Sequence, residues 1–205
     1  MALVAETPRN NRYAQDPRLR REIFKASVRC FNRFGLRRAT MDDVAEEAGV
    51  SRKTVYNYFD NKSVLVAEFL YDEGRRLNAR AAKQIDFDLP PAELLVEAEM
   101  ASLTSSRKSP HVDMLCNPDA ITVTAELVNH SERLAEIQRE YWQPIFARLE
   151  QCGALVPGLD FAEAVTWITF IHFVLVANPA TFRGDPAFTR RLLHRYLIPS
   201  ILRPS

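Results

Sequence analysis

Cysteine and histidine, the side chains most often used as nucleophiles, proton shuttles and zinc ligands, are few in this chain of 205 residues, and they are scattered along it. The cysteines are odd in number and have no short paired spacing, so they favour neither a disulfide framework nor a zinc site; they are Cys30, Cys116 and Cys152. The histidines belong to no metalloprotease pattern and pair with no cysteine, and the chain has no Gly-rich phosphate loop; they are His111, His130, His172 and His194. His172 lies in an apolar segment, where a satisfied core histidine is expected, and only His111 is a candidate pocket residue. We therefore predict no catalysis, no cofactor and no bound metal.

A second group of side chains is suited to contacting double-stranded DNA. The group has the spacing of one helix face and consists of Arg52, Lys53, Tyr56 and Asn57. Arginine and lysine can donate to guanine O6 and N7 in the major groove, and tyrosine can contact a phosphate or a thymine methyl. Nearby hydroxyl and ammonium groups suit phosphate oxygens, which fix register without reading sequence; they belong to Thr40, Thr54, Tyr58 and Lys62.

Two short helices, at 41–48 and 52–58, are predicted to position these side chains. Thr40 can cap the first helix, with Asp43 three residues later as in a loose capping box, and Ser51 can cap the second. Gly49 can adopt the left-handed conformation that a tight turn requires. Val55 and Phe59 are expected to point into the core. This layout is that of a helix-turn-helix; the alternative is two solvated helices in a helical bundle.

Further helices are predicted before and after this motif, so we expect an all-α fold of about nine helices. Asp16-Pro17 should start an amphipathic helix that ends at Gly35. Later helices are expected at 62–82, 91–107, 119–128, 131–152 with a kink at Pro144, 161–177 and 186–202. The expected division is a flexible tail at 1–15, a helix-turn-helix domain at 16–62, and a helical effector-binding and dimerisation domain at 63–205.

Charge is distributed unevenly between the two ends of the chain. Residues 1–65 contain 13 Lys or Arg against 8 Asp or Glu, whereas the remaining residues contain 14 against 18. A basic head on an acidic body favours a polyanionic partner for the head. No segment is long and apolar enough for a membrane span, and no signal peptide is evident, so we expect a cytoplasmic protein.

Residues 40–62 resemble the DNA-binding domain of the TetR family of transcriptional regulators. The family pattern runs T-x-x-x-I/V-A-x-x-A-G-V-S-x-x-T-L/V-Y-x-Y-F-x-x-K, and Thr40 through Lys62 satisfies nearly all of it. The resemblance is specific over residues 18–70. It implies phosphate contacts by Thr40, Thr54, Tyr56, Tyr58 and Lys62, base-facing positions at Arg52, Lys53 and Tyr56, and Ser51 within the same DNA-binding set. Lys53 departs from the glycine that many members have, so either base reading or a phosphate contact remains open for it.

The resemblance also implies a homodimer built from the last two helices and a body that binds an effector. The 161–177 segment is apolar nearly all round, which independently favours burial on two sides, either by a partner copy or at the centre of a monomeric bundle. The candidate dimer residues are Ile168, Ile171, Leu175, Leu192 and Tyr196. Candidate liners of a pocket for a small apolar or aromatic effector are Leu103, Met114, Trp142, Phe146, Trp167 and Phe170, each of which can equally be ordinary core.

The function expected from these features is a ligand-responsive repressor that binds a palindromic operator as a dimer. The expected partners are therefore an operator duplex, a second copy of the chain and an unidentified effector, with no membrane involved. A helical adaptor whose basic head binds protein or acidic lipid is the alternative. Arg9 and Arg12 either enter a flanking minor groove or belong to a solvated tail.

Overall fold

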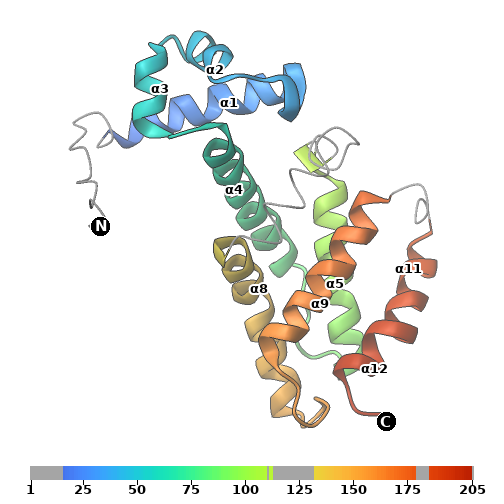
Figure 1. Ribbon diagram of the computed structural model, residues 1–205. Helices are drawn as coiled ribbons and strands as arrows, with labels where there is room; N and C mark the ends of the chain where they lie inside the picture. The colour runs from blue at the N-terminus through green and yellow to red at the C-terminus, as the bar shows by residue number, and fades with distance from the viewer. Residues whose placement is uncertain (1–15, 110, 113–131, 179–184, 205) are drawn as a thin grey trace, which may run out of the picture. The chain divides into compact units, whose positions relative to one another are not determined.

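The computed structural model describes residues 16–109, 111–112, 132–178 and 185–204. Within these ranges the regular structure is helical, apart from one isolated bridge between Leu155 and Leu202 (Figure 1). The predicted all-α fold is confirmed. The chain divides into two compact units, Met1–Phe69 and Leu70–Ser205, whereas the predicted tail at 1–15 and the predicted helix at 119–128 lie outside the described residues.

The first unit contains α1 (Pro17–Arg38), α2 (Met41–Ala48) and α3 (Arg52–Tyr58). The Asp16 carboxylate accepts hydrogen bonds from the backbone N–H groups of Arg18 and Leu19, at 2.8 and 3.3 Å, which starts α1 as predicted. Gly35 has φ 80°, a value that L side chains rarely adopt, and the helical path breaks there before a last turn. The buried side of α1 packs on α2 and consists of Ile23, Ala26, Ser27, Cys30, Phe31 and Leu36.

Helix α4 (Lys62–Ala82) begins in the first unit and ends in the second. Asn61 caps it, because its side-chain oxygen accepts a hydrogen bond from the Val64 N–H at 3.0 Å. In the first unit the Phe69 ring meets the Phe31 ring edge-on, with centroids 6.1 Å apart. This aromatic pair fixes the first turns of α4 on α1.

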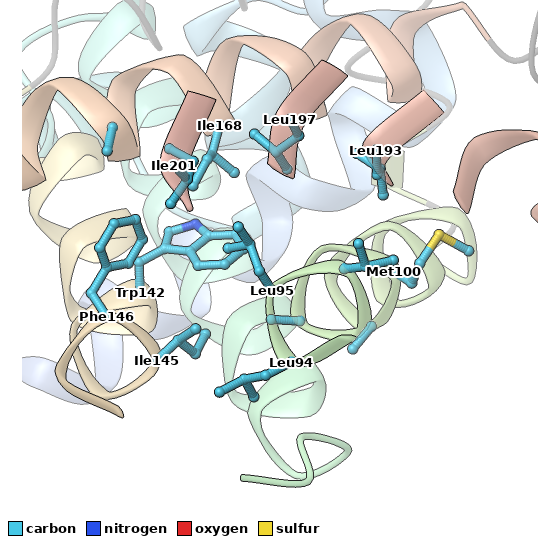
Figure 2. Packing of buried hydrophobic residues seen from close by; sticks show 14 of the residues in the cluster. Leu94, Leu95, Met100, Trp142, Ile145, Phe146, Ile168, Leu193, Leu197 and Ile201 are labelled. Atoms are coloured by element: carbon cyan, nitrogen blue, oxygen red, sulfur yellow. The ribbon is translucent and has the colours of Figure 1, made fainter. Parts of the chain in front are cut away.

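The second unit is built around α5 (Pro91–Arg107), α8 (Glu132–Gln151) and α9 (Phe161–Ala177). Its core draws side chains from all of these helices and from the C-terminal helices (Figure 2), among them Leu95, Trp142, Phe146, Ile168, Leu193 and Leu197. Pro144 lies inside α8, which continues as one helix from Glu132 to Gln151.

The C-terminal helix, predicted to be continuous over 186–202, is interrupted. It consists of α11 (Pro186–Leu192), a π-helical turn η2 (Leu193–Leu197) and α12 (Ile198–Ile201). The Ile198 N–H donates to the Leu193 carbonyl, five residues back. Pro199 explains the change of register, because proline has no N–H to donate to the carbonyl four residues before it and its ring crowds that carbonyl.

No helix in the described ranges combines the length and the apolarity that crossing a membrane requires.

Candidate nucleic-acid interface

The start of α2 is fixed by a reciprocal pair of hydrogen bonds. The Asp43 N–H donates to Thr40 Oγ1 at 3.2 Å, and the Thr40 N–H donates to Asp43 Oδ2 at 2.8 Å. The Thr40 hydroxyl also donates to Asp43 Oδ2 at 2.7 Å. These hydrogen bonds, first that of the hydroxyl and then that of the backbone, lower the pKa of Asp43, so the cap is ionised at neutral pH. The predicted capping box is present in full.

The turn between α2 and α3 depends on Gly49. Its backbone has φ 66° and ψ 32°, the left-handed conformation predicted for it. The Val50 N–H donates to the Ala45 carbonyl at 3.0 Å, and the Gly49 N–H donates to the Glu46 carbonyl at 3.1 Å. This pair of bonds is a Schellman motif, which satisfies the carbonyls at the end of α2 and reverses the chain toward α3.

Helix α3 is held on its inner side by two side chains. Val55 is 0% exposed and Phe59 is 1% exposed, so both point into the core as predicted. The Arg20 guanidinium lies over the Phe59 ring, 5.0 Å from the centroid. Ser51 caps the helix, since its Oγ accepts a hydrogen bond from the Thr54 N–H at 3.1 Å. With its inner side buried, α3 must present its opposite side to solvent.

Three of the candidate DNA-contacting side chains lie together on the exposed side of α3, namely Arg52, Lys53 and Tyr56. Arg52 Nε lies 3.0 Å from Asp42 Oδ1, and its Nη1 donates to Asp42 Oδ2 at 3.1 Å. The same guanidinium lies 5.4 Å from the Tyr56 ring centroid. Both partners of the Arg52–Asp42 pair are largely exposed, so water screens the pair and Arg52 can exchange Asp42 for another partner.

The hydroxyl and ammonium groups expected to contact phosphates are mostly engaged inside the unit. Thr54 Oγ1 shares a hydrogen bond with Ser51 Oγ at 2.8 Å. Lys62 is half-buried and its Nζ donates to the Arg37 carbonyl at 2.8 Å, while burial lowers its pKa. The Tyr58 hydroxyl oxygen is buried, and this burial raises its pKa. Tyr58 therefore does not offer its hydroxyl to solvent in this conformation.

Two arginines that the sequence analysis did not single out also lie on this unit. Arg37 and Arg38 end α1, with Ala39 between them and Thr40, and both are exposed. Two consecutive cations close to a helix cap are a signal present in the sequence, but they lie outside the motif at 40–62.

The residues considered as pocket liners separate into two groups in the second unit. Leu103, Trp142 and Phe146 are buried in the core cluster. Trp167 and Phe170 are instead 45% and 57% exposed, and their rings stack with centroids 5.8 Å apart. Met114 lies outside the described residues.

Helices α4 and α8 are in direct contact where they meet. Asn78 donates to the Ile137 carbonyl at 3.2 Å, and the Arg133 guanidinium lies 4.2 Å from the Tyr71 ring centroid. Open space of about 980 Å³ lies instead along α8 and α9, a groove that Trp167 and Phe170 border together with Leu134, Ala135, Gln138, Arg139, Val165, Thr166, Thr169 and Phe173, among others.

The residues considered for the dimer interface differ in their exposure. Ile168 and Leu175 are buried in the core of the chain itself, because they lie on the side of α9 that faces the rest of the unit. Ile171 and Leu192 are partly buried, and Tyr196 is 63% exposed. The large apolar side chains that are exposed on these helices are Trp167, Phe170, Phe188 and Tyr196.

Two buried glutamates anchor polar networks that the sequence analysis missed. The Glu73 carboxylate on α4 accepts hydrogen bonds from the Ser109 hydroxyl and from Arg76 Nη2 at 2.5 Å, and its Oε2 lies 3.0 Å from His111 Nδ1. Glu99 on α5 pairs with His172 of α9, with Oε1 and Nδ1 3.0 Å apart. The two networks join helices within the unit, which accounts for the position of His172 as a satisfied core histidine and for the engagement of His111.

A family model described as bacterial regulatory proteins, tetR family, matches residues 23–69. The chain is 28% identical over 179 residues to an uncharacterized HTH-type transcriptional regulator of Mycobacterium tuberculosis, a match that covers 87% of this chain and 83% of that regulator. It is 26% identical over 158 residues to the HTH-type transcriptional repressor KstR2 of Mycolicibacterium smegmatis, covering 73% of this chain and 77% of the repressor.

Among solved structures, the chain is similar to the transcriptional repressor QsdR of R. erythropolis. The TM-score is 0.64 at 19% identity, and the match covers 91% of this chain and 97% of that one. At this identity the likeness is one of fold. The match spans the helix-turn-helix and the helical body alike.

Proposed function

We propose that this chain, a member of the TetR family of transcriptional regulators, is a repressor that binds a palindromic operator as a homodimer and is released by a small, largely apolar effector. Members of the family regulate transcription and are not enzymes. The observation that carries the DNA-binding part is the exposure of Arg52, Lys53 and Tyr56 on α3, while Val55 and Phe59 hold the helix from behind. We place its action in the cytoplasm, where the operator lies.

Base reading is assigned to Arg52 and Lys53, and backbone contacts to the residues around them. Arginine presents two donors that match guanine O6 and N7. Arg52 is the first residue of α3, and the N-terminal residues of a recognition helix are those that reach base edges. Thr40, Ser51, Thr54, Tyr56 and Lys62 are assigned to the phosphates, where they set the position of α3 without reading sequence.

Dimerisation is assigned to the exposed side of α9 and the C-terminal helices. Two stacked aromatic rings, Trp167 and Phe170, are exposed beside an open groove, and Tyr196 adds a third. A site for a small molecule encloses most of its ligand, whereas an apolar face of this kind is typical of an interface. We therefore assign Trp167 and Phe170, first considered as pocket liners, to the face covered by a second copy. A symmetric dimer would place two α3 helices on a symmetric operator.

The effector is assigned to the interior of the second unit. Tyr141, Trp142 and Phe146 form a series of edge-to-face aromatic contacts, with centroids 5.2 and 6.4 Å apart. An apolar molecule that inserted among them would shift the population of body conformations. If a saturating candidate effector leaves operator affinity unchanged, that molecule is not the effector; if no molecule that binds the body changes it, the ligand-responsive part of the proposal fails.

The test of the DNA-binding part starts from selection of bound sequences out of a random duplex pool. Fluorescence anisotropy of the full-length chain on the selected duplex and on a scrambled duplex, over a range of salt concentrations, measures affinity and specificity together. We expect a palindromic selected sequence, a preference for it, and affinity that falls steeply with salt. Equal affinity for the selected and the scrambled duplex would favour the adaptor alternative and would contradict the proposal.

A further inference from the structure

We infer that Arg37 and Arg38 form a phosphate-binding strip beside the helix-turn-helix, which holds the sugar-phosphate backbone of the duplex. The inference rests on the proposed function and adds a contact surface outside α2 and α3. The strip is defined as the two guanidinium groups at the end of α1, which Ala39 separates from the Thr40 cap.

The first reason is that these two cations are free, whereas many exposed cations of the same unit are already paired. Arg20, Lys25, Arg29 and Arg52 form ion pairs of 3.2, 2.9, 2.6 and 3.0 Å with Glu68, Glu22, Glu47 and Asp42. In the described part of the chain, the guanidinium groups of Arg37 and Arg38 form no hydrogen bond and no ion pair. They can therefore bind an external anion without breaking an internal contact.

The second reason is that the backbone beneath the strip is fixed. Gly35 turns the chain with φ 80°, and the Ala39 N–H donates to the Gly35 carbonyl at 3.1 Å. From the other side, Lys62 Nζ donates to the Arg37 carbonyl at 2.8 Å. The strip is thus attached directly to the first residue of α4 and stands next to the cap of α2. Anchoring of this kind limits the entropy lost when the two side chains bind.

The third reason is that the nearest carboxylates along the chain do not compete for the strip. Asp42 is paired with Arg52, and Asp43 is bonded to the side chain and backbone of Thr40. Lys62 adds a further positive charge at the Arg37 carbonyl. The local field at the strip is therefore that of cations, which attracts a polyanion.

The chemistry of arginine and the position of the strip favour phosphate over base. The planar guanidinium donates two parallel hydrogen bonds to phosphate oxygens. The strip ends α1 and lies outside α3, the helix assigned to the major groove, so we assign it to the backbone and not to the base edges. Two contacts of this kind would strengthen binding to every sequence equally.

The experiment compares salt dependence across matched variants on the selected and scrambled duplexes. The variant Arg37→Gln/Arg38→Gln removes the strip, and Arg37→Lys/Arg38→Lys keeps its charge. The control, Arg80→Gln/Lys83→Gln, removes the same charge from two exposed cations of the second unit. Circular dichroism and urea unfolding check that the variants fold like the wild type, as exposed substitutions should.

We expect Arg37→Gln/Arg38→Gln to lower the slope of log affinity against log salt by about 0.9 per lost contact, or about 1.8 per bound protomer. Its affinity for the two duplexes should fall by the same factor, while the lysine variant and the control keep slopes near that of the wild type. A slope for the glutamine variant equal to that of the control overturns the strip, as does a change in preference between the duplexes. If the wild type itself shows neither salt dependence nor preference, the proposed function fails, and the strip fails with it.

Discussion

At the scale of single residues, exposure and pairing distinguish side chains that are open to DNA from those that also hold the domain together. Arg52 and Lys53 are exposed, whereas Lys62 is half-buried and bonded to a carbonyl of α1. Positive side chains in this motif therefore either stay open to DNA or bond the backbone of the domain. Two predictions follow from this difference.

Arg52→Ala should relax base preference at one position of each half-site by about 1–3 kcal/mol, because a base-reading side chain is lost. Affinities on the selected duplex and on single-base variants measure the change. Asp42→Ala is the matched control, since it breaks the same ion pair and keeps the guanidinium. Equal loss of affinity on matched and mismatched duplexes would contradict the assignment of Arg52 to base reading.

Lys62→Ala should lower the free energy of unfolding by about 1 kcal/mol, because it removes the hydrogen bond that joins α4 to the Arg37 carbonyl. It should also weaken binding to all duplexes by one common factor. Urea unfolding and anisotropy measure the two effects. Unchanged unfolding with weakened binding would mean that Lys62 acts on DNA alone.

At the scale of elements, glycine conformation and buried carboxylates decide how the helices are joined. Gly49 has a positive φ, whereas Gly74 lies within α4 in ordinary helical conformation. Glu73, also on α4, is buried and bonded to residues that follow α5. Substitutions at these positions should change the free energy of unfolding in different directions, and the change at Glu73 should depend on pH.

Gly49→Ala should destabilise the chain by about 1–2 kcal/mol, because the left-handed conformation strains an L side chain even though nothing lies within 4 Å of the added Cβ. Gly74→Ala should stabilise by roughly 0.5–1 kcal/mol, because the new Cβ meets only Ile137 Cγ2 at 3.9 Å and helical glycine is costly. Urea unfolding of both variants compares them. A Gly49→Ala variant as stable as the wild type would show that the turn tolerates other conformations, and a destabilised Gly74→Ala variant would contradict the second prediction.

Glu73 should make the second unit sensitive to acid. Burial opposes its ionisation, but the hydrogen bonds from Ser109, His111 and Arg76 outweigh burial and lower its pKa. A lowered folded-state pKa stabilises the fold above the unfolded value of about 4.3 and loses that stabilisation as pH falls through the folded value. Glu73→Gln should therefore reduce the fall in unfolding free energy below about pH 5. The exposed Glu150→Gln variant is the control, and equal pH profiles for the two variants would contradict the role of Glu73.

At the scale of the whole molecule, the apolar surface that a single copy leaves open determines how it assembles. Trp167, Phe170 and Tyr196 are exposed on helices whose other sides form the core. Exposed aromatic groups of this size cost solvation free energy that a second copy would recover.

Trp167→Glu/Phe170→Glu should convert a dimer into monomers, because two buried charges would have no partner in the interface. Light scattering measures the mass, and circular dichroism checks the fold. Tyr141→Phe, which removes only a buried hydroxyl bonded to the Ala98 carbonyl, should stay dimeric. A dimeric glutamate variant would place the interface elsewhere.

The sequence predicted the first unit, with its helix-turn-helix, in more detail than the second unit. Caps, the turn glycine and the two sides of α3 depend on neighbours a few residues away, so Thr40, Gly49, Val55 and Phe59 could be assigned from spacing. The burial of Trp142 or Ile168 depends on packing between helices far apart in the chain, which periodicity does not reveal. The π-helical turn before Pro199 was not predicted, because the apolar period that indicates a helix does not report which carbonyl each N–H bonds.

The ion pair between Arg52 and Asp42 has a consequence for how the helix-turn-helix would discriminate between DNA sequences. Two nitrogens of the Arg52 guanidinium already face the Asp42 carboxylate. A duplex must therefore displace Asp42 before it can bind Arg52. A DNA site with a single acceptor would leave Arg52 bound to Asp42. A guanine offers two acceptors, O6 and N7, with the spacing of two guanidinium donors, and can replace Asp42. Asp42 would then compete with DNA for Arg52, and the competition would shorten the lifetime of complexes with non-specific sequences.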